Sequence, residues 1–136
     1  MSPTVKNILV FIVALVAGGA VVYGFETMSH QLFPPPADIN SNDLESLKNI
    51  MKNAPAGSLA LVILAHAVGA MVSGWIIGRF AASSHRMLAL TMGLLWTITG
   101  VANLVMIPHP VWFSISDACV YLPMTLLGLK LSEKTT

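Results

Sequence analysis

Charged side chains are scarce in this chain. Only 10% of its 136 residues are Asp, Glu, Lys or Arg, whereas 55% are hydrophobic. A soluble domain carries roughly 25% charged residues, so this chain has too few of them to cover a surface in water. A mean hydropathy of +0.76 agrees. We therefore expect the lipid bilayer to be the solvent of this protein and its main partner.

Other shortages exclude whole classes of function. The seven basic residues are dispersed and the formal net charge is +1, so we expect no nucleic-acid partner. The single Cys119 cannot form an internal disulfide, and we expect it to be a small core residue. The sequence contains no HExxH, CxxC, GxSxG or Walker glycine loop. It therefore indicates no catalytic residue and no particular cofactor, and we do not predict an enzyme.

Long apolar runs, by contrast, are abundant. Four of them reach the ~20 residues needed to cross a hydrocarbon core; they cover about 5–28, 57–80, 86–107 and 113–131. A cleaved signal peptide is a weaker interpretation of the first run, which is long, has only Lys6 as a basic residue at its start and ends without a clear cleavage site. The sequence predicts an all-α membrane protein, a single membrane domain over 1–136 that forms an antiparallel four-transmembrane-helix bundle.

The one long polar stretch is the predicted loop 31–55. It begins near three prolines, 34–36, which end any helix. Within it, apolar and charged residues alternate at helical spacing, which predicts a short amphipathic helix over about 43–52 with Ser41 or Asn42 as its N-cap. This helix serves either as an ordered connector on the membrane surface or as a lid over the bundle.

Basic residues indicate the orientation of the spans. One side of the predicted bundle carries Lys6, Arg79, Arg86, Lys130 and Lys134, and the other carries only Lys48 and Lys52, which Asp38, Asp43 and Glu45 offset. Both termini are therefore predicted to be cytoplasmic, and the loop 31–55 extracytoplasmic.

The second span carries the clearest packing pattern, HAVGAMVSGWIIGR over 66–79. Small residues recur every four positions on two adjacent helical faces, and small residues allow close approach of helices in lipid. We therefore expect this span to be the central post of the bundle. The residues predicted to pack helices together are Gly69, Ser73, Gly74, Gly78, Gly93 and Gly100.

Polar residues gather in the outer half of the predicted spans. Each span contributes one: Glu26, His66, Asn103 and Asp117, with His30 and His109 at the rim. An ionisable side chain in hydrocarbon costs roughly 2.5 kcal/mol or more unless it faces water or a partner. These side chains are predicted to converge on a ligand or proton site. His66, Glu26 and Asp117 are the candidate metal ligands, should a metal bind, although the pattern matches no established metal motif.

Each of these residues also has a structural interpretation. His66 can be a structural histidine that bonds Asp117, Asn103 or a backbone carbonyl. Glu26 and Asp117 can reach the nearby interface by extending their side chains. Asn103 is more often an interhelical hydrogen-bonding residue than a substrate contact.

Two segments, GFETMSHQLFPPP and HAVGAMVSGWIIGR…GVANLVMIPHPVWF, resemble a group of small four-span bacterial inner-membrane proteins of unassigned function. Glu26, the triple proline, His66 and the turn IPHPVWF carry the resemblance. It implies a multi-pass protein of the bacterial inner membrane and brings no catalytic assignment.

Two functional hypotheses follow. In the first, a pocket at the outer mouth binds a small ligand, a metal ion or a proton. In the second, the chain is a structural or assembly subunit that packs against a membrane-protein partner or forms a homo-oligomer, because its small-residue faces exceed what one bundle needs.

Overall fold

The structure, a computed structural model, describes residues 1–37 and 42–133. Asp38, Ser41 and Lys134 lie outside these ranges. The described residues form five α-helices and no strand: α1 Pro3–Leu32, α2 Leu44–Asn53, α3 Ala56–Phe80, α4 His85–Met106 and α5 Val111–Glu133. All except α2 are long and apolar enough to cross a membrane. The chain is therefore an all-helical protein with the architecture of a multi-pass membrane protein.

Helix α1 is longer than the span predicted for it. Pro3 occupies its first turn, where the missing N–H costs nothing, and the Ser2 hydroxyl accepts a hydrogen bond from the Val5 amide. The helix continues to Leu32, within the predicted loop 31–55. At ~1.5 Å per residue, its 30 residues exceed the ~30 Å hydrocarbon core. Its last turns, which carry Glu26 and His30, therefore extend toward the membrane surface.

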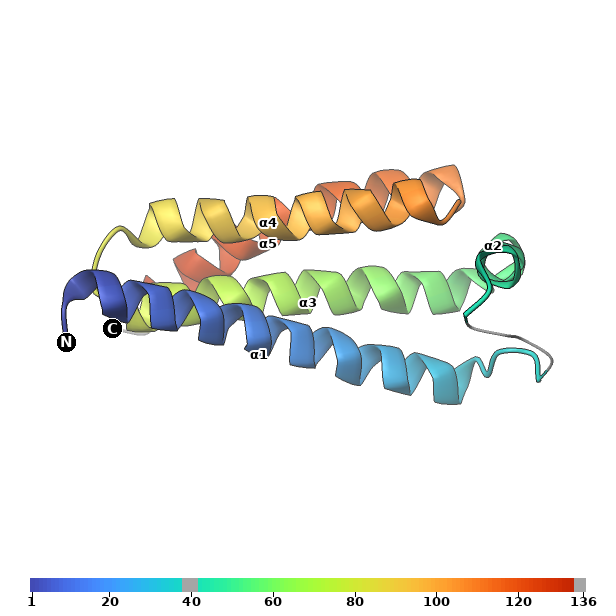
Figure 1. Cartoon of the computed structure of the whole chain (residues 1–136), viewed down its shortest axis with the longest axis horizontal. Coiled ribbons are helices and arrows are strands. Elements are labelled where there is room, and N and C mark those ends of the chain that lie inside the picture. The colour runs from blue at the N-terminus through green and yellow to red at the C-terminus, as the bar shows by residue number, and fades with distance from the viewer. Residues whose placement is uncertain (38–41, 134–136) are drawn as a thin grey trace.

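Helix α2 is strongly amphipathic but lies outside the bundle, at one end (Figure 1). Its N-cap is Asp43, and the prediction of Ser41 or Asn42 is wrong. The Asp43 carboxylate accepts hydrogen bonds from the side chain and amide of Ser46 and from the amide of Glu45. These bonds, the Ser46 hydroxyl first, hold the pKa of Asp43 below its usual value. An ionised carboxylate makes stronger hydrogen bonds to free amides than a neutral hydroxyl or amide does.

Helix α3 occupies the centre of the bundle. It packs against α1, α4 and α5, while α1 touches α4 only slightly (Figure 1). The turn from α3 to α4 lies at the same end as the start of α1, where the Asn7 side chain accepts a hydrogen bond from the Ala82 amide at 2.8 Å. The free side of α1 and the outer sides of α4 and α5 are apolar and exposed, as a lipid-facing surface requires.

The closest packing joins α3 to α5. A Cβ on Gly74 would lie 1.9 Å from the Thr125 carbonyl oxygen, and one on Gly128 would lie 1.9 Å from the Met71 oxygen. Further along, Gly78 faces Ser132. Residue numbers rise together from the His66–Asp117 contact through Gly74–Thr125 to Gly78–Ser132, so α3 and α5 run in the same direction. Helix α4 separates them in the sequence. Short connections predict contacts between consecutive helices, so they did not predict this one.

Small residues also join the other helices. The backbones of Gly18 in α1 and Gly69 in α3 meet, and the Ser73 hydroxyl donates to the Ala14 carbonyl at 2.8 Å. In α4, Gly93 accommodates Leu122 and Gly100 accommodates the ring of Tyr121. Both small-residue rows of α3 thus face other helices of the same chain.

Cys119 is exposed on α5, so its prediction as a core residue is wrong. The buried residues of α5 include Phe113, Asp117, Tyr121 and Thr125, which are spaced four apart. Position 119 lies about 200° around the helix from Asp117, on the opposite side.

Candidate functional site

Three polar side chains meet between α3 and α5. His66 Nδ1 lies 2.6 Å from Asp117 Oδ1, and the Tyr121 hydroxyl donates to Asp117 Oδ2 at 2.9 Å. The Tyr121 oxygen also lies 2.8 Å from His66 Nδ1. We name His66, Asp117 and Tyr121 the polar triad. An ionised carboxylate can only accept hydrogen bonds, so in this state Nδ1 carries a hydrogen that it donates to Asp117.

Burial makes these bonds essential. Asp117 is 2% exposed, and so is Tyr121. A buried carboxylate without partners would be far more costly than one with both oxygens bonded, and here each oxygen has a donor. His66 is only partly buried, and its Nε2 makes no hydrogen bond to any described residue. One ring nitrogen is therefore fixed by the protein, and the other is open.

Tyr121 belongs to the site, although nothing in the sequence singled it out. It lies four residues after Asp117, on the same helical face, and this spacing allows its hydroxyl to reach the carboxylate. Gly100 of α4 makes room, since a Cβ there would lie 2.6 Å from the Tyr121 oxygen. The available signals were the Asp-x-x-x-Tyr spacing and a glycine at the facing position, and both are weak without knowledge of which helices meet.

Trp96 connects the polar triad to the α1–α3 contact. Its ring stacks on Tyr121 with centroids 6.4 Å apart and an interplanar angle of 3°. Its Nε1–H donates to the Ser73 hydroxyl at 3.3 Å, and that hydroxyl in turn bonds the Ala14 carbonyl. The position of the Tyr121 ring thus depends on packing across three other helices.

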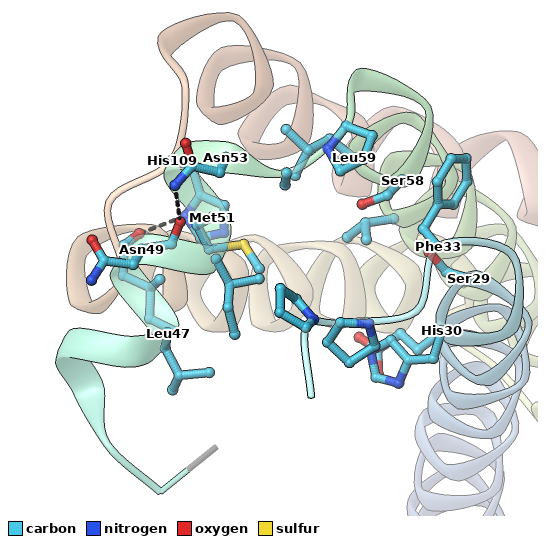
Figure 2. A pocket seen from close by; sticks show the side chains of 18 of the residues that line it. Ser29, His30, Phe33, Leu47, Asn49, Met51, Asn53, Ser58, Leu59 and His109 are labelled. Atoms are coloured by element: carbon cyan, nitrogen blue, oxygen red, sulfur yellow. Dashed lines mark hydrogen bonds between the residues drawn. The ribbon is translucent and has the colours of Figure 1, made fainter. Parts of the chain in front are cut away.

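A pocket of about 970 Å³ lies at the α2 end of the bundle. Figure 2 shows Leu47 and Met51 of α2 on one side and His30 and Phe33, at the end of α1, on the other. The floor comes from the start of α3, with Leu59 among its residues. The pocket therefore lies between the short helix and the mouth of the bundle.

The predicted site residues fall into two groups. Glu26, Asn103, His30 and His109 line the pocket, whereas His66 and Asp117 pair with each other deeper in the bundle. The structure therefore does not bring Glu26, His66, Asn103 and Asp117 together at one point, as the sequence predicted.

The two groups are nevertheless close to each other. Leu59 and Val62 line the pocket, and His66 follows Val62 by one turn on the same face of α3. The polar triad thus lies about one helical turn below the floor of the pocket.

A metal site is not supported by the described part of the chain. Among residues 1–37 and 42–133, no three His, Cys, Asp or Glu side chains are placed to hold a metal ion. His66 and Asp117 alone would provide two ligands, and Nδ1 of His66 and Oδ1 of Asp117 already bond each other.

Comparisons with protein-family models, with curated proteins and with solved structures found no match for this chain. The pocket and the polar triad are therefore the features of the structure that bear on function. A bacterial origin and an inner-membrane location remain predictions from the resemblance.

Proposed function

We propose that this protein is a multi-pass membrane protein that binds a small ligand in the pocket and exchanges a proton at His66 beneath it. The observation that carries the proposal is the polar triad: Asp117 holds one nitrogen of His66, and Nε2 has no partner among the described residues. Proton exchange at the free nitrogen then accompanies ligand binding in the pocket.

The chemistry of the triad supports proton exchange. A carboxylate bonded to Nδ1 fixes the ring and its tautomer, and it stabilises the imidazolium when Nε2 takes up a proton. The Tyr121 hydroxyl bonds the second carboxylate oxygen, so Asp117 stays satisfied in either charge state of His66. Among the described residues, the titratable side chains that contact His66 are Asp117 and Tyr121 of α5.

The orientation of the bundle forms part of the proposal. We infer an antiparallel up-and-down arrangement, with both termini cytoplasmic and the pocket facing outward in a bacterial inner membrane. The excess of Lys and Arg at one end supports it. So do the contacts of α1 with α3, where Ala14 meets Ser73 and Gly18 meets Gly69; numbers rise in one helix as they fall in the other.

Trp96 provides a direct test of the proton site, because it stacks on Tyr121 within the same network. Trp75 and Trp112 are exposed, so a variant with both replaced by Phe leaves Trp96 as the only tryptophan. Its fluorescence is titrated from about pH 5 to about pH 8, where histidine ordinarily changes charge. We expect one transition, which His66→Gln abolishes.

His85→Gln is the matched control. His85 lies at the opposite end of the bundle and contacts the Ala81 carbonyl at 3.1 Å, so its loss should leave the Trp96 transition intact. If His66→Gln retains the parental transition, or if Trp96 shows none, His66 does not exchange protons in this range and the proposal fails.

The alternative function is assembly through the free side of α1. Helix α1 packs mainly on α3, and a Cβ on either Gly19 or Gly24 would meet nothing within 4 Å. A second copy or another membrane protein could cover this side. Light scattering of the purified parent and of Gly19→Leu in detergent tests this function by measuring their oligomeric states. If the parent is a monomer, the homo-oligomer version of the proposal is refuted.

A further inference from the structure

The charge within the pocket is of one sign. Glu26 is the only Asp, Glu, Lys or Arg among the described residues that line it. Its carboxylate makes no ion pair or hydrogen bond to another described side chain, while His66 and Asp117 are paired elsewhere. With histidines neutral, the pocket therefore presents one negative charge and no fixed positive charge.

The remaining lining is mostly apolar and aromatic. Phe33 closes one side, and His109 stacks on Phe113 with ring centroids 4.9 Å apart. Leu47, Ile50 and Met51 of α2 contribute an aliphatic wall. Aromatic faces attract cations as well as apolar groups, so these walls suit an apolar body that carries a positive charge.

We propose that the ligand of the pocket is a lipophilic organic cation, whose charge is neutralised by Glu26 and whose apolar groups lie against α2 and the aromatic rings. A volume of about 970 Å³ is at the upper end of the range for small-molecule sites. The inference rests on the ligand pocket of the proposed function, but it does not depend on proton exchange at His66.

The test uses two ions of the same shape and opposite charge. Tetraphenylphosphonium and tetraphenylborate are titrated separately into the full-length protein in zwitterionic nanodiscs at pH 7.5, and uptake by empty nanodiscs is subtracted. We expect saturable binding of the cation with an affinity at least about tenfold above that of the anion, as expected when a single charge decides between ligands.

Glu26→Gln tests the carboxylate, and Glu45→Gln is its matched control. Glu45 belongs to the first turn of α2 and does not line the pocket. Both residues are exposed, so neither change should unfold the protein. We expect Glu26→Gln to weaken binding of the cation about tenfold or more and to remove its advantage over the anion, with Glu45→Gln unchanged.

The outcomes are distinct. Equal binding of both ions, no saturable binding of the cation, or equal binding by the parent and Glu26→Gln each overturn the cation inference. Cation binding that depends on Glu26 supports it even if Trp96 fails to titrate, in which case only proton exchange is lost. A Trp96 titration without cation binding leaves the proton site standing and refutes the ligand class.

Discussion

Replacing Gly74 by Ala tests the close contact between α3 and α5. The added Cβ would lie 1.9 Å from the Thr125 carbonyl oxygen, whereas ordinary contact begins near 3.4 Å. The obstacle is backbone, so no change of side-chain rotamer relieves it. The two helices must therefore separate by about 1.5 Å along this line or tilt by an equivalent amount.

The expected loss of stability is about 2 kcal/mol. Overpacking of a close contact typically costs about 1–3 kcal/mol, and the helix preference of Ala over Gly returns up to ~1 kcal/mol. Separation of α3 from α5 also stretches the contact of 2.6 Å between His66 and Asp117, about two turns away. Loosening of this buried bond increases the loss.

Gly19→Ala is the control, because a Cβ there meets nothing within 4 Å. It should be neutral or stabilise the protein by up to ~1 kcal/mol. Both variants are unfolded by titration with a denaturing detergent from the same micelles, with helicity as the signal. If Gly74→Ala and Gly19→Ala differ by less than about 0.5 kcal/mol, α3 and α5 do not pack as closely as described.

Three further predictions concern other parts of the molecule. His66→Leu should cost roughly 3–5 kcal/mol because it leaves one oxygen of the buried Asp117 without a donor, whereas adding Asp117→Leu and Tyr121→Phe, which removes the hydroxyl that would otherwise be left unpaired, should recover most of that loss in the same unfolding assay; equal losses for the single and the triple variant would refute this. Asp43→Ala should speed amide hydrogen exchange in the first turn of α2 several-fold. Because the pKa of Asp43 is lowered in the folded chain, the cap should persist at neutral pH and weaken only as the pH falls below the ordinary carboxyl value of 3.8. Exchange in the parent that is already fast at neutral pH would contradict this prediction. Cys119 should react with a membrane-permeant maleimide but poorly with a charged one, because it is exposed on an apolar helix, and labelling by neither reagent would mean that it is buried.

The central position of α3 could be predicted from the sequence, because few kinds of side chain can hold helices together in lipid. Where no hydrophobic force draws helices together, Gly, Ala and Ser at four-residue spacing favour the closest contacts. Two such rows on one helix predict two neighbours, and the structure provides α1 beside Gly69 and α5 beside Gly74. An unpartnered histidine in the same span also had to find a polar neighbour, and Asp117 was among the few available.

The missed features depend on which helices meet and at what rotation. Tyr121 resembles any aromatic residue of an apolar run until Asp117 is placed beside it. Cys119 was assigned by residue type rather than from the face that α5 buries. The division of the polar residues into a pocket group and the polar triad depends on side-chain contacts between helices, because Glu26 lines the pocket whereas His66 bonds Asp117.

Stability alone does not account for the polar triad. A pair of Leu residues in place of His66 and Asp117, with Tyr121→Phe to remove the hydroxyl that would otherwise be buried without a partner, would stabilise the α3–α5 contact about as well as the polar triad, since burial of polar and charged groups costs most of what their bonds return. The apolar pair would lack a ring nitrogen that is held in a fixed orientation one turn below a pocket and has no partner among the described residues. This triple variant, expected to be stable and to lack the titrating histidine, therefore separates the two roles: loss of the Trp96 transition in a folded bundle would assign the triad to proton exchange rather than to packing.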